Sequence, residues 1–432
     1  MKRVPFLLAL IFPVSAGQIR PLIKDFIGLN GHTVQFKPDL YAPIARLARD
    51  YHPISWDLDK NTSEPAPFPF AKNRVNWDTV YRSWQKEGWN TNACLMFDRI
   101  QPADWKDLEN DARRYGQNFA REFGPSGTRR LVQSIEIGNE PGHWSDEHYR
   151  QIFQSMAQGV RKGDPEIKIA SCNLTIGPSG KYEKSVSCLN EFSDLVDVLT
   201  IHTYAQLENW PTWKRSFPED PALPNYIKDV EKLCTWRDKH MPGKPVWITE
   251  FGYDSSTKPQ LESGTFSKWV GVTDKQQAQW LVRSLLVFSS MPVERAYIYF
   301  FNDSDEAQLH ASSGLTRNFQ PKPSFHAVTH LQKTLGNSRF TRIVKNEPDK
   351  VRIQEYQDEE NPDRFIWVIW HPGCEDTPRS IKLRNRPGKL VGTSKMPLSS
   401  RRPNQGGIEI STNFDLDIQI DGSPLFFTFE KE

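Results

Sequence analysis

Cysteine is scarce in this 432-residue chain, which contains only five such residues. Their odd number and wide spacing exclude both a disulfide-stapled scaffold and a zinc-binding pattern. Cys172 and Cys188 flank one expected loop, so a bond between these two stays open. The other three are expected as buried core thiols.

Long apolar runs are also lacking beyond the first residues. No later segment reaches about 18 uninterrupted apolar residues, which argues against a membrane span in the mature protein. Residues 1–16 combine two basic residues, a short apolar run and a small-residue end, the pattern of a cleavable signal peptide. A buried strand or a short membrane anchor is the alternative. We therefore predict a secreted or periplasmic protein.

An excess of either charge is missing as well. The 55 Lys and Arg residues nearly cancel the 53 Asp and Glu residues, so nothing points to a nucleic acid or an anionic membrane as partner. Aromatic residues are abundant, with 14 Trp, 12 Tyr and 25 Phe. Flat rings stack on the apolar faces of sugars, although they also fill cores. The composition does not indicate an oligomeric state.

Short apolar runs alternate with amphipathic stretches, which is typical of βα units around a parallel sheet. The expected strands cover residues 26–30, 53–56, 92–97, 132–137, 167–170, 197–201, 245–249 and 296–300. The expected helices cover residues 39–50, 77–86, 103–123, 146–161, 181–192, 225–240, 274–289 and 324–335. Eight such pairs predict a fold of the α/β class, the (β/α)8 TIM barrel.

The pattern changes after residue 335, where strands without helices follow one another. These strands are expected at residues 340–344, 351–356, 364–370, 381–383 and 408–429. A small C-terminal antiparallel β-sandwich is the simplest interpretation. The predicted organisation is therefore a signal peptide at 1–16, a catalytic barrel at 19–336 and a β-sandwich accessory domain at 337–432.

Two glutamates stand at the ends of expected barrel strands. Glu140 follows the fourth strand and Glu250 the seventh. In barrels of this kind, the reactive groups lie at the carboxyl ends of the strands. Cleavage of a glycosidic bond requires one carboxyl group to protonate the leaving oxygen and another to attack the anomeric carbon. The two glutamates therefore indicate a glycosidase.

The surrounding motifs resemble those of clan A glycoside hydrolases. Residues 139–141 read Asn-Glu-Pro and residues 249–252 read Thr-Glu-Phe-Gly, as in that clan at strands four and seven. The resemblance covers roughly residues 25–335 and is nearest to family 39 and its uncharacterised relatives. It implies that Glu140 is the acid/base, that Glu250 is the nucleophile and that Asn139 binds the sugar 2-hydroxyl.

Residues 202–204 read His-Thr-Tyr and resemble the His-x-Tyr motif of the clan at strand six. The resemblance implies that Tyr204 orients the nucleophile and that His202 lines the sugar site; a purely structural histidine is the alternative. The chain departs from the clan at strand two, where an Arg often supports the nucleophile and the sequence reads Ser55-Trp56-Asp57.

Further substrate-binding residues are expected at the rim of the barrel. Asn30 and His32 stand at the end of the first strand, although His32 could equally be structural. Asn302 follows the eighth strand, and Trp56 offers a ring for stacking on a sugar, with ordinary packing as the alternative. Other rim aromatic residues with the same two alternatives are Phe68, Phe70, Trp144, Trp210 and Trp213.

No metal and no cofactor is expected, because no His has a second ligand at the short spacings of zinc sites. Glu136 points into the barrel and is interpreted as a structural carboxylate with a basic partner. The predicted function is a retaining glycoside hydrolase acting on an oligo- or polysaccharide, with carboxyl groups about 5–5.5 Å apart. A non-catalytic glycan-binding barrel and a transglycosylase with the same residues are the alternatives.

Overall fold

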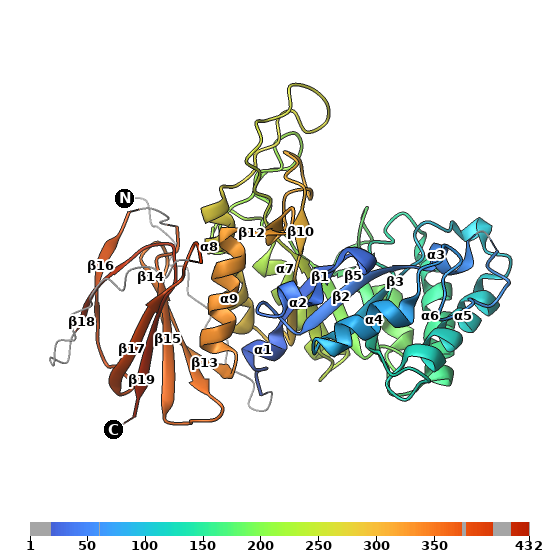
Figure 1. The fold of residues 1–432 in the computed structure, drawn as a ribbon, viewed down its shortest axis with the longest axis horizontal. Helices are drawn as coiled ribbons and strands as arrows, with labels where there is room; N and C mark the ends of the chain where they lie inside the picture. The colour runs from blue at the N-terminus through green and yellow to red at the C-terminus, as the bar shows by residue number, and fades with distance from the viewer. Residues whose placement is uncertain (1–18, 60, 374–376, 401–415, 432) are drawn as a thin grey trace, which may run out of the picture.

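The barrel strands of the structure, a computed structural model, close into one parallel ring (Figure 1). The structure describes residues 19–59, 61–373, 377–400 and 416–431, so the expected signal peptide at 1–16 lies outside them. In ring order the strands are β1 (Ile27–Gly31), β2 (Leu47–Pro53), β3 (Asn90–Met96), β4 (Val132–Ile137), β5 (Lys168–Thr175), β7 (Val198–His202), β8 (Val246–Phe251) and β9 (Arg295–Ile298). The pairing of β1 with β9 closes the ring and confirms the predicted TIM barrel.

Helices of ordinary length cover most of the ring. They are α4 (Trp77–Lys86), α5 (Leu108–Phe123), α6 (Asp146–Gly163), α7 (Ile227–His240), α8 (Asp274–Ser289) and α9 (Pro323–Leu335). Their first turns are fixed by side chains that accept backbone N–H groups, as where Ser145 caps α6 and Thr273 caps α8. Short helical turns, α1 (Ile23–Phe26) and α3 (Ile54–Leu58) among them, complete the layer.

The expected helix at residues 39–50 was wrong. The chain forms only a 3-10 turn, η1 (Thr33–Gln35), and the short α2 (Pro38–Tyr41) before β2 begins at Leu47. Every residue of β2 is buried although the strand carries Arg49, Asp50 and His52. Arg49 finds its partners inside the barrel, whereas Asp50 and His52 bond to residues between the strands and the surrounding helices. Because each polar group has a partner, a segment that resembles a surface helix folds as a buried strand.

The expected helix at residues 181–192 was also wrong. The chain forms a two-residue strand, β6 (Lys184–Ser185), followed by the 3-10 helix η3 (Val186–Phe192). Lys184 is buried and its ammonium group donates to the backbone carbonyl of Trp144, which holds the segment in this shape. Cys172 and Cys188 are both buried free thiols.

The C-terminal strands form two antiparallel sheets, as predicted. One contains β13 (Ser338–Glu347), β14 (Val351–Asp358), β15 (Arg364–Trp370), β19 (Leu425–Glu430) and β17 (Lys389–Lys395), and the other pairs β16 (Arg379–Leu383) with β18 (Leu416–Ile420). A separate apolar cluster, with Trp367 and Phe427 from one sheet and Ile418 from the other, joins them into a sandwich. The last barrel helix ends at Leu335, and β13 begins at Ser338.

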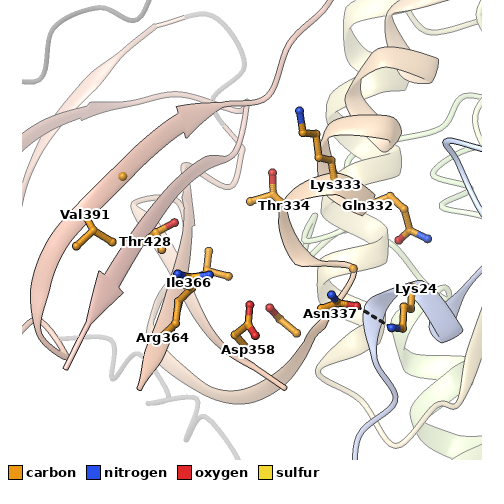
Figure 2. A pocket seen from close by; sticks show the side chains of 13 residues that line it. Lys24, Gln332, Lys333, Thr334, Asn337, Asp358, Arg364, Ile366, Val391 and Thr428 are labelled. Carbon is orange, nitrogen blue, oxygen red and sulfur yellow. Dashed lines mark hydrogen bonds between the residues drawn. The ribbon is translucent and has the colours of Figure 1, made fainter. Parts of the chain in front are cut away.

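The five-stranded sheet uses its other face to pack on the barrel, next to α9 (Figure 1). A cavity of about 570 Å³ lies at this junction, lined by Lys24, Lys333, Asp358 and Thr428 among others (Figure 2). Since α1 precedes β1, this cavity lies at the amino ends of the barrel strands, away from the reactive face of such barrels. None of the described helices is both long and apolar enough to cross a bilayer.

Candidate active site

The two predicted glutamates meet at the carboxyl end of the barrel. Glu250 is the second-last residue of β8, and Glu140 follows β4 by three residues. Gly138, with φ of 87°, makes the turn between β4 and Glu140, and a Cβ there would lie 2.9 Å from the ring of Phe97. Only glycine tolerates both the positive φ and this contact. Gly138 thus fixes the turn that positions Glu140.

Arg49 on β2 connects the groups beneath the site. Its guanidinium donates to Glu136 through Nε at 2.7 Å and through Nη2 at 2.9 Å. It also donates to Glu250 Oε1 at 3.0 Å. Arg49 and Glu136 have no exposed side-chain surface, so the pair is a fully buried salt bridge. The sequence interpretation of Glu136 as a paired structural carboxylate is confirmed.

Sequence reasoning missed Arg49 as the basic support of the predicted nucleophile. The expected second strand was placed at residues 53–56, whereas the strand ends at Pro53 and α3 follows directly. The reading of Ser55, Trp56 and Asp57 as the strand-two position was therefore wrong. The signal was Arg49, which lies four residues before Pro53 in a segment that Pro43 prevents from being one helix.

Glu250 is nearly surrounded by donors. Its Oε1 accepts hydrogen bonds from Tyr51 at 2.6 Å and Arg49 at 3.0 Å, and its Oε2 accepts from Tyr204 at 2.9 Å. Burial alone would raise the pKa of Glu250. The positive charges of His202 and Arg49 and the hydroxyl donors outweigh it and lower this pKa to about 2. Glu250 is therefore ionised at neutral pH.

His202 lies between the two glutamates. Its Nδ1 is 2.9 Å from Glu140 Oε1 and 3.5 Å from Glu250 Oε2, and its side chain is only 2% exposed. Burial opposes protonation, but the charge of Glu250 and the hydrogen bond to Glu140 raise the pKa of His202 above its usual value. The Nδ1 atom thus contacts both carboxyl groups, and the buried Nε2 has no hydrogen-bond partner among the described residues.

Asn139 and Asn30 both receive a hydrogen bond from Arg49, at 2.8 Å and 3.0 Å. Asn139 is half-buried beside Glu140, so its amide nitrogen can still meet a ligand. Asn30 is fully buried and donates to the backbone carbonyls of Thr249 and Ile298. The structure therefore places Asn30 under the site, where it ties Arg49 to neighbouring strands.

The remaining residues predicted to bind substrate differ in their contacts. His32 is exposed and its ring lies 5.0 Å from that of Tyr51, one of the donors to Glu250. Asn302, on β10 (Asn302–Asp303), accepts from Thr316 and Phe319, so it fixes a turn. Trp56 is half-buried on α3 and stacks on Trp77. His32 alone of these three has a contact with a Glu250 partner.

The rim aromatic residues differ in exposure. Trp144 is only 2% exposed and packs on Phe97, and Phe68 packs on α5 through Phe119. By contrast, Trp210 is 71% exposed. It belongs to the segment between β7 and α7, which with neighbouring segments projects beyond the barrel in Figure 1. Packing in the core therefore accounts for Trp144 and Phe68, but not for Trp210.

Arg215 and His310 are two site residues that the sequence did not single out. The Arg215 guanidinium lies 4.5 Å from the centre of the Tyr204 ring and forms a buried ion pair with Asp254. The His310 ring meets Tyr204 at 4.9 Å. Burial, helped by the positive charge of Arg215, lowers the pKa of His310. Both loop residues contact the Tyr204 ring, so they help to orient its hydroxyl.

A metal could find three ligand atoms here. One oxygen each of Glu140 and Glu250 and a ring nitrogen of His202 lie within 4.8 Å of one another. The three residues are far apart in the sequence, and the barrel joins them at the carboxyl ends of β4, β7 and β8. Metal binding requires a neutral histidine, whereas the two carboxylates favour the protonated ring. The arrangement fits a charged hydrogen-bonded triad better than a metal centre.

Removal of the Tyr51 hydroxyl tests the surroundings of Glu250. In the Tyr51→Phe variant we expect kcat for glycoside cleavage to fall by about 10- to 100-fold, because a hydrogen bond to a charged group is lost. Tyr115→Phe is the control, since its buried hydroxyl donates to Asp57 and not to Glu250. Equal losses of activity in the two variants would contradict a specific role for Tyr51.

No protein-family model and no curated protein sequence matches the chain. Solved structures are similar to it along almost its whole length. A family 39 glycoside hydrolase from Bacteroides cellulosilyticus WH2 has a TM-score of 0.68 at 16% identity, over 95% of this chain and 81% of that one. A glucosidase from Croceicoccus marinus has a TM-score of 0.64 at 13% identity, over 96% and 98%. A family 30 subfamily 8 xylanase from Clostridium acetobutylicum has a TM-score of 0.59 at 10% identity, over 95% and 97%.

At such identities the likeness establishes a shared fold. The structural neighbours are glycoside hydrolases of several families, and the similarity extends over both barrel and sandwich. The predicted resemblance to clan A glycoside hydrolases is therefore confirmed at the level of the fold. Fold alone does not determine chemistry, so function depends on the groups at the site.

Proposed function

We propose that this chain is a retaining glycoside hydrolase that cleaves an oligo- or polysaccharide by double displacement. The observation that carries the proposal is the arrangement of Glu140 and Glu250, which approach each other at the carboxyl end of the barrel with His202 between them. The reaction requires two carboxyl groups of different character at one site.

The surroundings of the two glutamates support different roles. The Glu250 side chain is 7% exposed and carries its charge at neutral pH, as a nucleophile must. The Glu140 side chain is 30% exposed, so a leaving-group oxygen can reach it. In the first step, Glu250 attacks the anomeric carbon while Glu140 gives its proton to the departing oxygen. In the second step, Glu140 accepts a proton from water, which attacks that carbon and releases Glu250.

The separation of the two groups supports retention of configuration. One oxygen of each glutamate lies within 4.8 Å of one oxygen of the other. Retaining enzymes hold their carboxyl groups about 5–5.5 Å apart, and inverting enzymes about 6.5–9.5 Å to admit a water molecule. The short separation therefore favours direct attack by Glu250.

A panel of aryl glycosides, oligosaccharides and polysaccharides tests this function. Proton NMR during the first turnovers should show that the released sugar keeps its anomeric configuration. Inverted product would contradict the retaining mechanism, and tight binding without turnover would indicate a glycan-binding barrel. Sugar transfer that outpaces hydrolysis in the same reactions would indicate a transglycosylase.

We also propose that the protein acts outside the cytoplasm, because its first 16 residues have the composition of an export signal. Expression in a secreting host, with mass spectrometry of the exported amino terminus, should show cleavage near Ala16. An intact terminus on intracellular protein would contradict export.

His202 should set the acidic limit of activity. Glu250 must be ionised, so kcat/KM should fall only as the pH approaches its pKa of about 2. Replacement of the cation in His202→Asn raises this pKa, and the acidic limb moves to higher pH. The measurement is the pH profile of kcat/KM with an activated aryl glycoside, and His148→Asn, an exposed site on α6, is the control. An unmoved limb would show that His202 does not lower this pKa.

A further inference from the structure

We infer that the segment of residues 176–185, between β5 and η3, binds the sugar that leaves with the proton of Glu140, and that Tyr182 is its stacking platform. This inference rests on the proposed function and assigns a binding site to the part of the glycan that leaves. The leaving group would be a sugar ring rather than an alkyl or lipid chain. Tyr182 would then hold the leaving sugar while Glu140 protonates the glycosidic oxygen of that sugar.

The first observation is the contact between this segment and the turn that carries Glu140. Gly142 lies two residues after Glu140, and a Cβ there would come within 2.3 Å of the Lys181 carbonyl carbon and 2.5 Å of the Tyr182 nitrogen. The backbone of Tyr182 therefore packs directly against the acid-bearing turn, an approach that only glycine allows.

The second observation is the buried cation that joins the two segments. Lys184 is 1% exposed, and its ammonium group donates to the carbonyl of Trp144 and to Asp146 at 3.3 Å. Ser179 donates to Asp146 as well, at 2.6 Å. A buried ammonium without these acceptors would be costly, so the contacts are maintained together. The position of Tyr182 relative to Glu140 is therefore fixed before any ligand binds.

The third observation is the exposure of the Tyr182 ring. Tyr182 is 49% exposed. Among the described Phe, Trp and Tyr residues, only Phe70 and Trp210 are as strongly exposed. Phe70 lies two residues after Phe68, whose ring packs on Phe119 of α5. Trp210 lies in the segment after β7. Tyr182 is thus the exposed aromatic residue whose own backbone contacts the Glu140 turn.

Polar groups next to Tyr182 suit the hydroxyls of a sugar. The Lys181 ammonium lies 5.0 Å from the centre of the Tyr182 ring. Glu183 lines a cavity of about 240 Å³ together with His202 and Tyr204, which bind the two glutamates. Tyr182 offers an apolar ring, and its chain neighbours Lys181 and Glu183 offer a charged donor and a charged acceptor. This combination matches a pyranose, which has apolar faces and a polar edge.

The experiment compares a sugar leaving group with an aryl leaving group of the same glycone. For Tyr182→Ala we expect the ratio of oligosaccharide to aryl-glycoside kcat/KM to fall about five- to tenfold, through a higher KM for the oligosaccharide. Tyr182→Phe should restore the ratio because the ring remains. Gly142→Ala should lower it as well, by displacing the platform.

A second readout uses the covalent intermediate. The 2-fluoro-glycosyl enzyme, trapped on Glu250, should be reactivated by cellobiose or xylobiose more slowly in Tyr182→Ala than in the unmodified protein. Trp236→Ala, on α7 against His240, is the matched control and should leave both measurements unchanged. An unchanged ratio and unchanged reactivation in Tyr182→Ala would overturn the inference alone. A protein that turns over no glycoside at all would overturn the proposed function, and the inference with it.

Discussion

Replacement of Glu250 by alanine should reduce turnover of every glycoside by a factor on the order of 10⁴ or more, since removal of a nucleophile leaves only binding and secondary contacts. The loss should be partly reversed by azide, because the small anion fits where the carboxylate was and attacks the anomeric carbon. The product should be a glycosyl azide of inverted configuration. Chromatography and NMR of the azide product are the measurements.

Glu140→Ala is the matched variant, and its behaviour should differ. Dinitrophenyl glycosides need no proton for departure, so their first step should remain fast, whereas natural glycosides should be cleaved slowly. Azide should then yield the retained glycosyl azide, because Glu250 still forms the intermediate. Inverted azide from Glu140→Ala, or full activity of Glu250→Ala, would contradict the assignment of the two roles.

The glutamates could be predicted from the sequence because local patterns place them. In a parallel barrel, residues that directly follow a strand lie at the carboxyl-end rim, as Asn139, Glu140 and Pro141 do after β4. The same holds for Glu250 near the end of β8. Strand ends are set by a few neighbouring residues, so their position does not depend on distant packing.

Arg49 could not be placed in the same way, because its partners are distant in the sequence. Glu136 and Glu250 lie 87 and 201 residues further along the chain. Without them, charged residues in a segment with leucine and alanine favour a surface helix. The folded barrel pairs Arg49 with Glu136 and Glu250, and this pairing helps to make a fully buried strand of Leu47–Pro53 favourable.

The rim could be predicted only in part for a related reason. Trp144 and Trp210 both stand in segments that follow barrel strands, yet they are 2% and 71% exposed. Their exposure depends on contacts between segments, such as Phe97 against Trp144, that no local pattern encodes. Tyr182 likewise gained its position from Gly142 and Lys184, which a sequence pattern does not connect to it.

The barrel centre also shows why stability and activity are coupled here. Glu250 receives donors from β2 and from the residues after β7, while Arg49 must also satisfy Glu136. A substitution at Arg49 therefore changes the charge balance of a buried structural pair and of the nucleophile at once. Positions such as Tyr51, whose hydroxyl donates to Glu250 and not to Glu136, should separate the two effects.

Arg49→Met should destabilise the barrel strongly. It leaves Glu136, which has no exposed surface, without its ionic partner, and loss of one member of a buried ion pair typically costs about 3–5 kcal/mol. The free energy of unfolding in urea should fall accordingly, and kcat should fall because Glu250 loses a donor. Arg49→Lys should restore little, because one ammonium group cannot replace a fork that bonds two carboxylates and two amides.

The double variant Arg49→Met with Glu136→Gln separates the two consequences. Removal of both charges should recover part of the lost stability, since no uncompensated carboxylate remains in the interior. Activity should not recover, because Glu250 still lacks the Arg49 hydrogen bond and its pKa rises toward the ordinary value. If the double variant were less stable than Arg49→Met alone, the buried pair would not be the source of the destabilisation. If it regained full kcat, Arg49 would support the fold without supporting the nucleophile.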